Sequence, residues 1–183
     1  IMDVFHTEYY DYDLPNDRIA IEPKSNRADS KMMYVESSQS HHMGFNHLSD
    51  ILESGDLLIL NNTRVMPARL FLEKETGGKI EILYNQDINQ NQFEVIFKSS
   101  RRPLNGSILH YKKKYLFKVV SSKGNKLVLD NLCDENINKI LEVYGEIPLP
   151  KYIKRPVDRK DKKMYQTVYA KVNGSVAAPT AGL

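Results

Sequence analysis

Residues 57–70 read LLILNNTRVMPARL, and this stretch governs the interpretation of the whole chain. It opens with four apolar residues, Leu57 to Leu60, a run that is typical of a strand buried on both faces. Four hydrogen-bonding side chains follow at once, namely Asn61, Asn62, Thr63 and Arg64. A buried strand that ends in a polar cluster often forms a binding site in α/β folds, but asparagines also suit a plain turn. The residues alone leave both interpretations open.

The sequence pattern changes after Pro67. Six short segments have the composition of strands, and glycine-rich, asparagine-rich or lysine-rich turns separate them; they cover residues 69–73, 79–84, 93–98, 107–111, 115–121 and 126–130. Strands at this spacing predict a small antiparallel barrel or sandwich. A helix should follow, with Asp134 as its N-cap and Gly145 just after its end. Residues 147–150, Ile-Pro-Leu-Pro, then predict a rigid extended linker.

The segments on either side of this region have a mixed pattern. Before residue 57 we expect a strand at 32–35, a polar loop at 36–44 and a short helix from residue 48 that ends at Gly55. After residue 150 we expect a basic loop or helix start at 151–163 and regular structure at 164–169. His41, His42 and His47 have no carboxylate or thiol at ligand spacing beside them, so we predict a solvated loop and no metal site.

Charge is distributed unevenly along the chain, although the net charge is only +3. Nine lysines or arginines and no acidic residue lie between Val95 and Leu129, and seven basic residues against two acidic ones lie between Lys151 and Lys163. Such windows form either a solvated surface or a face that meets a nucleic-acid backbone. The single cysteine, Cys133, excludes an internal disulfide and a cysteine-based zinc site, and a reducing, cytoplasmic setting is the default. No apolar run reaches the length of about eighteen residues that spans a bilayer, so no membrane partner is expected.

The general catalytic motifs are missing from the sequence: there is no glycine-rich phosphate loop, no G-x-S-x-G and no H-E-x-x-H. What remains is a set of hydrogen-bonding side chains that suits a polar small molecule or a nucleotide, comprising Asn61, Asn62, Thr63, Arg64, Arg69, Tyr165, Gln166, Thr167, Tyr169 and Thr180. Tyr165 and Tyr169 would share a face of a helix, whereas Tyr165 and Thr167 would share a face of a strand. Packing of the tyrosines in a core or an interface is an equally good interpretation.

Several longer motifs together indicate one family. They are YDLP at 12–15, NNTRV at 61–65, PARL at 67–70, GGKIE at 77–81, PLPKYI at 148–153, YQTVY at 165–169 and AAPTAGL at 177–183. On these motifs the chain resembles S-adenosylmethionine:tRNA ribosyltransferase-isomerase of queuosine biosynthesis. Members of that family are about twice as long as this chain. The resemblance therefore implies an N-terminal half that is inactive by itself.

The resemblance implies an α/β plus all-β fold, in which a small antiparallel β-barrel is inserted into an α/β barrel-like domain that is partial here. Residues 1–66 would begin the α/β domain, 67–147 would form the barrel and 148–183 would return to the α/β domain. The implied activity transfers the ribosyl part of S-adenosylmethionine, a co-substrate, to 7-aminomethyl-7-deazaguanine at the tRNA wobble position and isomerises it. Epoxyqueuosine forms, and adenine and methionine leave. A non-catalytic RNA-binding module and an inactive fragment remain as alternatives.

The motif positions also suggest roles for particular residues. Arg64 and Arg69 would bind a carboxylate or phosphate through two contacts, while Asn61, Asn62 and Thr63 would hold ribose hydroxyls or the adenine edge. Thr180 would line the same pocket, together with Tyr165, Gln166 and Tyr169. The candidates for contacts to tRNA phosphates are Arg101, Arg102, Lys112, Lys113, Lys114, Arg155 and Arg159. We assign no general base and no metal ligand, and we expect a monomer.

Overall fold

The computed structural model describes residues 5–150 and 152–182. The chain divides into two compact units, of which one comprises residues 1–56 and 151–155 and the other 57–150 and 156–183. No helix in the described ranges is long and apolar enough to cross a bilayer.

The first unit is built from short elements. Three 3₁₀ turns, η1 (Thr7–Tyr10), η2 (Asn16–Arg18) and η3 (Arg27–Asp29), precede the antiparallel hairpin of β1 (Lys31–Glu36) and β2 (Gln39–Gly44), and η4 (Phe45–His47) and α1 (Leu48–Ile51) follow it. The loop expected at 36–44 is therefore wrong. Residues 36 and 39–44, although mostly polar, belong to a hairpin, because Ser37 takes a positive φ of 55° and allows the tight turn that joins its two strands. The helix ends at Ile51, before Gly55, and the described residues hold no group of metal ligands.

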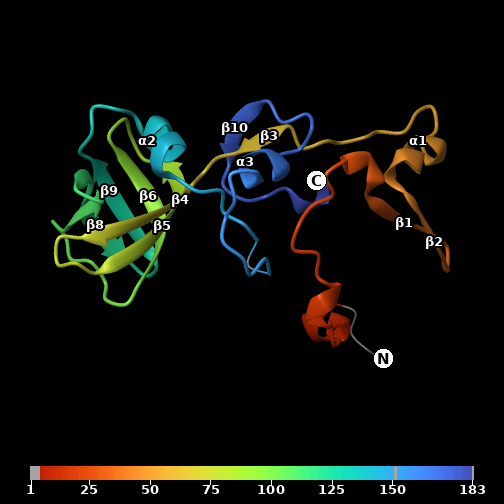
Figure 1. Ribbon diagram of the computed structural model, residues 1–183, viewed down its shortest axis with the longest axis horizontal. Helices are drawn as coiled ribbons and strands as arrows, with labels where there is room; N and C mark the ends of the chain where they lie inside the picture. Colours follow the sequence, from red (N-terminus) through yellow and green to blue (C-terminus); the bar gives the residue numbers. More distant parts are fainter. Residues whose placement is uncertain (1–4, 151, 183) are drawn as a thin grey trace. The chain divides into compact units, whose positions relative to one another are not determined.

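The second unit contains a closed barrel of six antiparallel strands (Figure 1). The strands, in barrel order, are β4 (Arg69–Lys74), β5 (Lys79–Asp87), β6 (Gln92–Ser99), β9 (Lys126–Asn131), β8 (Lys114–Lys123) and β7 (Ile108–Tyr111). The pairing of Glu73 with His110 and of Lys74 with Leu109 closes the barrel. All six predicted strands are present, and the barrel alternative is confirmed over the sandwich.

The barrel interior is filled by the alternate residues of each strand. Leu70 and Leu72 of β4 point inward, and the matching residues of the other strands meet them in one cluster in which Val95, Leu109 and Leu129 are fully buried. Burial of each leucine or isoleucine contributes about 1.5–3 kcal/mol relative to leaving it exposed. The period-2 pattern that predicted the strands is thus also what holds the barrel together.

Helix α2 (Ile137–Tyr144) packs its apolar residues Ile137, Ile140 and Leu141 against the same cluster. Its N-cap is Asn136, whose side chain accepts from the Lys139 amide at 3.0 Å, so the expected cap at Asp134 is wrong by two residues. Both residue types cap well, and the pattern alone does not choose between them. Gly145 follows the helix as expected, but its φ is −84° and it is no left-handed cap.

The chain leaves the barrel beside the point where it enters. Arg69 and Glu146 exchange two backbone hydrogen bonds, of 3.1 and 2.8 Å, which place the exit next to the start of β4. A β-carbon at Gly145 would collide with the carbonyl oxygen of Pro67. The segment that follows is packed and not a free linker, because Ile147 and Leu149 are 1% and 5% exposed.

The remainder of the second unit pairs the two ends of its sequence. Strand β3 (Thr63–Val65) lies parallel to β10 (Val172–Ser175), with α3 (Asp161–Met164) before β10 and η5 (Thr180–Gly182) after it. A parallel pair connected through a helix is characteristic of α/β structure. The prediction of an α/β part joined to an antiparallel barrel is therefore confirmed.

The buried strand expected at Leu57–Leu60 is wrong. These four side chains are between 50% and 85% exposed, and regular structure begins only at Thr63. An apolar run becomes a buried strand when other strands and helices cover it, and no described strand pairs with this one. The composition of the run was therefore insufficient to predict its structure.

Candidate functional site

The polar cluster after Leu60 first of all shapes its own backbone. The Asn61 side-chain oxygen accepts from the Thr63 amide at 2.8 Å and from the Thr63 hydroxyl at 2.6 Å. The Asn62 carbonyl accepts from the amides of Lys171 and Val172, which leads the chain into β10. The observed contacts of the Asn61 side chain are thus those of a turn residue.

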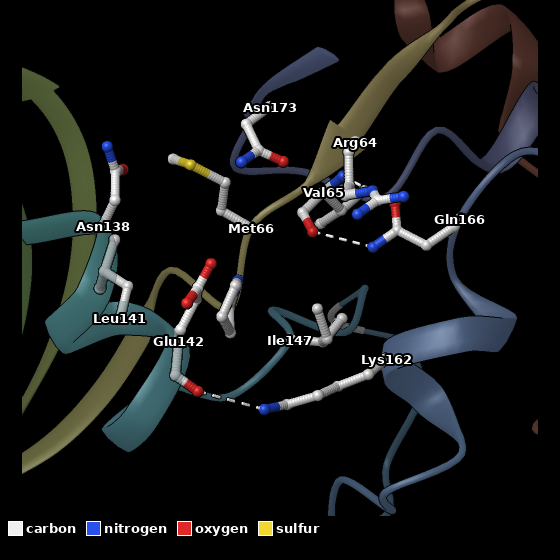
Figure 2. A pocket seen from close by; sticks show the side chains of 11 residues that line it. Arg64, Val65, Met66, Asn138, Leu141, Glu142, Ile147, Lys162, Gln166 and Asn173 are labelled. Atoms are coloured by element: carbon white, nitrogen blue, oxygen red, sulfur yellow. Dashed lines mark hydrogen bonds between the residues drawn. The ribbon is translucent and has the colours of Figure 1, made fainter. Parts of the chain in front are cut away.

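Gln166 holds β3 from the edge that β10 leaves free. Its side-chain oxygen accepts from the Val65 amide and its side-chain nitrogen donates to the Val65 carbonyl, both at 2.8 Å (Figure 2). One primary amide thereby takes the place of a neighbouring strand for a residue that is only 2% exposed. Gln166 was predicted to bind substrate, but both ends of its amide are bonded to the backbone that carries Arg64.

A cavity of about 210 Å³ lies beside β3 (Figure 2). Strand β3 and the residues after it, helices α2 and α3, and β10 all contribute to its wall. The lining residues are Arg64, Val65, Met66, Pro67, Asn138, Leu141, Glu142, Ile147, Lys162, Gln166 and Asn173. Segments that are far apart in the sequence therefore meet at one partly open, mixed polar and apolar space.

The charged groups of this cavity come from opposite walls. Arg64 projects from β3 and Glu142 from α2, and Lys162 of α3 donates to the Glu142 carbonyl oxygen at 3.4 Å (Figure 2). The Glu142 carboxylate also lies 3.5 Å from the ammonium of Lys139, an exposed i, i+3 pair. Met66, Leu141 and Ile147 provide the apolar part. The space thus offers the Arg64 cation on one side, the Glu142 carboxylate together with the Lys162 ammonium on the other, and hydrocarbon between them.

Arg69 does not line this cavity. Its guanidinium Nε lies 3.3 Å from the Glu81 carboxylate on the neighbouring strand, and the two side chains are 25% and 32% exposed. That Nε is buried and makes no aligned hydrogen bond, so the contact is an ion pair. The structure therefore separates the two arginines that the sequence placed together.

The last two motifs meet each other. Residues 165–171 form turns, so neither the helix face nor the strand face expected for Tyr165 is present. Tyr165 is 6% exposed, and the Thr167 hydroxyl donates to the Asn61 carbonyl at 2.9 Å. A β-carbon at Gly182 would lie 3.0 Å from the Thr167 methyl group and 3.7 Å from the Tyr169 hydroxyl. The turn that begins with the exposed Thr180 therefore rests against Thr167 and Tyr169.

The seven basic residues predicted to contact tRNA do not form one patch. Lys112, Lys113 and Lys114 occupy the β7–β8 turn, at the barrel end where the chain enters. Arg101 and Arg102 lie at the other end, where the Arg102 guanidinium donates to the Gly124 carbonyl at 2.7 Å. Strand β8 joins the two ends, and its ten residues span about 33 Å.

The last two of these basic residues belong to different units. Arg155 lies in the first unit and donates to the Ile21 carbonyl at 3.0 Å, while Arg159 is an exposed residue of the second unit.

Sequence reasoning missed the cavity residues of α2 and α3. Asn138 and Glu142 are four residues apart and lie beside the apolar face that defined the helix. No local signal connects them to Arg64, because the whole barrel, residues 69–131, intervenes. Burial raises the pKa of the Cys133 thiol and disfavours the reactive thiolate.

A family model described as a queuosine biosynthesis protein matches residues 7–183. The chain therefore belongs to the queuosine biosynthesis protein family.

The chain is also similar to individual proteins. The chain is 42% identical over 174 residues to the S-adenosylmethionine:tRNA ribosyltransferase-isomerase of Vesicomyosocius okutanii, covering 95% of this chain and 51% of the relative. It is 41% identical to the protein of the same name from Azoarcus sp. strain BH72, covering 95% and 50%. The crystal structure of S-adenosylmethionine tRNA ribosyltransferase from Thermotoga maritima is 24% identical, with a TM-score of 0.37 and coverage of 79% and 52%. The chain thus spans about half the length of the relatives it matches, and the family resemblance noted from its motifs is confirmed.

Proposed function

We propose that this chain provides substrate-binding parts of an S-adenosylmethionine:tRNA ribosyltransferase-isomerase. The reaction transfers the ribosyl moiety of S-adenosylmethionine to 7-aminomethyl-7-deazaguanine at the tRNA wobble position and isomerises it to epoxyqueuosine, with release of adenine and methionine. Membership of the family and the names of the relatives support the reaction class. The structure suggests which part of the substrate the chain holds.

The observation that carries this proposal is the distribution of charge around the cavity. The methionyl part of S-adenosylmethionine has a carboxylate, an ammonium and a hydrocarbon chain that leads to the sulfonium, and the first three match Arg64, Glu142 and the apolar wall in turn. Arginine suits a carboxylate because its planar fork donates two parallel hydrogen bonds. Pockets for whole ligands measure about 300–1,000 Å³. A cavity of about 210 Å³ is below that range and fits the methionyl part of S-adenosylmethionine, while the nucleoside would extend outside it.

Three requirements of the chemistry follow from the substrate. A base must remove a proton next to the sulfonium, whose positive charge already acidifies that C–H bond. Departing adenine must be stabilised, and the attacking amine of the deazaguanine must be held in position. In our proposal Arg64 anchors the methionyl end and Gln166 fixes the backbone that carries Arg64. We assign the base to no residue of this chain.

A chimaera tests the reaction. This chain replaces the matching 174 residues of the Azoarcus relative, and the purified chimaera is incubated with S-adenosylmethionine and tRNA carrying 7-aminomethyl-7-deazaguanine. We expect adenine release, measured by liquid chromatography, and none when the tRNA carries unmodified guanine. A folded chimaera that releases no adenine while the intact relative does would overturn the proposal.

A further inference from the structure

The β7–β8 hairpin ends in a turn that carries three consecutive lysines, Lys112, Lys113 and Lys114, here named the lysine turn. On the strands next to this turn, His110 and Tyr115 are cross-strand partners, and their ring centroids are 6.0 Å apart at an interplanar angle of 86°. Tyr115 is 59% exposed, although its neighbours Leu116 and Phe117 are fully buried. A basic turn thus adjoins an aromatic pair that faces solvent.

The opposite face of the hairpin braces the lysine turn. The rings of Tyr111 and of Tyr144 in α2 are in tilted contact, with centroids 5.0 Å apart, and both pack against the barrel core. The Lys114 ammonium lies 5.6 Å from the centre of the Tyr144 ring and 3.5 Å from the Glu135 carboxylate. The hydrogen bond with Tyr144 raises the pKa of Lys114, so its positive charge is secure. These contacts therefore anchor the hairpin to the barrel and fix the position of the Lys114 ammonium.

The His110 ring has a defined orientation. Its Nδ1 lies 2.5 Å from the Lys112 carbonyl oxygen, and because a carbonyl only accepts, Nδ1 carries the hydrogen. In the neutral ring Nε2 then keeps a free lone pair that can accept a hydrogen bond. Lys113, at the tip of the turn, is exposed. The hairpin therefore presents a phenol and an imidazole acceptor on one face, the exposed Lys113 at its tip, and the ammonium groups of Lys112 and Lys114 over the Tyr111 and Tyr144 rings of the other face.

This combination suits unpaired nucleotides. Proteins that bind single-stranded nucleic acid combine a cationic surface for the backbone with aromatic rings on which bases stack. Glu73 of β4, the cross-strand neighbour of His110 on the other side, would repel phosphates there. A strand of RNA would accordingly place its backbone over the lysine turn and a base on Tyr115. An acidic protein segment could use the lysines but has no bases to stack on the ring.

We infer that the lysine turn and the His110–Tyr115 pair form a binding surface for unpaired RNA nucleotides, with Tyr115 as the stacking residue. The inference deepens the proposed function, on which it rests for tRNA as the natural source of the RNA. It assigns the other end of the barrel, with Arg101 and Arg102, no part in binding a short oligonucleotide.

The test is equilibrium binding of a fluorescein-labelled uridine oligoribonucleotide of about six nucleotides to the 183-residue chain, followed by fluorescence anisotropy at several salt concentrations. Loss of stacking in Tyr115→Ala should weaken binding about 5- to 150-fold without changing the salt dependence, and Tyr115→Phe should bind like the unaltered chain. Lys113→Gln should reduce the slope of log K against log salt by about 0.7. Lys123→Gln is the matched control, an exposed lysine at the far end of β8, and it should change nothing.

Each other outcome contradicts the inference. Unchanged affinity in a folded Tyr115→Ala would remove the stacking role, and equal effects of Lys113→Gln and Lys123→Gln would indicate diffuse attraction. If Tyr115→Ala impaired binding to anionic phosphatidylserine vesicles and not to RNA, the surface would be a membrane contact. Because the assay involves no turnover, an inactive chimaera with normal RNA binding would refute the proposed reaction alone.

Discussion

The bonds between Gln166 and Val65 allow a quantitative prediction. Gln166→Glu keeps the shape and still accepts from the Val65 amide, but it places a second oxygen 2.8 Å from the Val65 carbonyl where a donor stood. Gln166→Leu removes both partners. Because Val65 is 2% exposed, water does not readily replace either bond.

The expected cost follows from the number of buried groups left without a partner. Each such group costs about 1–3 kcal/mol, so Gln166→Glu should destabilise the local structure by about that amount and Gln166→Leu by about twice as much. A change of about 1.4 kcal/mol corresponds to a factor of about ten in an equilibrium constant. Local opening around Val65 should therefore become about 5- to 150-fold more frequent in the glutamate variant.

Hydrogen exchange at the Val65 amide, followed by NMR, measures this opening directly. Gln86→Leu is the matched control, since Gln86 is an exposed glutamine on β5 and its replacement should leave exchange at Val65 unchanged. If exchange at Val65 in Gln166→Glu equalled that of the unaltered chain, the claim that Gln166 holds β3 would be wrong.

Three further variants test other contacts. Gly145→Ala should lower the free energy of unfolding by about 1–3 kcal/mol in urea, because its β-carbon would overlap the Pro67 carbonyl; an unchanged midpoint would contradict this. Lys74→Met should lower the melting temperature, since the buried Lys74 ammonium donates to the Arg101 carbonyl at 2.8 Å; equal or higher stability would show that the bond contributes nothing net. Burial, and next a hydrogen bond with Asp87, raise the pKa of Tyr84 to about 12, above its ordinary value of 10.0. The unfolded chain therefore loses this proton at lower pH than the folded chain, so the free energy of unfolding should fall as pH rises from about 10 to 12. The free energy of unfolding of Tyr84→Phe should fall less steeply over this range. If the urea midpoints of the two proteins changed identically with pH, the shift would be refuted.

The barrel was predictable because its information is local. Alternation of apolar and polar residues in segments such as 79–84, with turns between them, determines both the strand and the face that it buries. The run at Leu57–Leu60 has no such alternation, and its state depends on what surrounds it. There the sequence-based interpretation was wrong.

The candidate site was only partly predictable for the same reason. Motif position located Arg64, but the separation of Arg69 depends on the register that places it near Glu81. The contributions of Glu142 and Lys162 depend on how α2 and α3 pack around β3 after the barrel has closed. Tertiary contacts of this kind leave no periodic signal in the sequence.

Binding of S-adenosylmethionine to the 183-residue chain, measured by isothermal titration calorimetry, tests the central claim most directly. Arg64→Leu removes a charged hydrogen-bond donor worth about 1.5–3 kcal/mol, so affinity should fall about 10- to 150-fold. Arg69→Leu, the matched control, should leave affinity unchanged because Arg69 pairs with Glu81 outside the cavity. Equal losses in the two variants, or no loss in Arg64→Leu, would contradict the assignment of the cavity to the methionyl group.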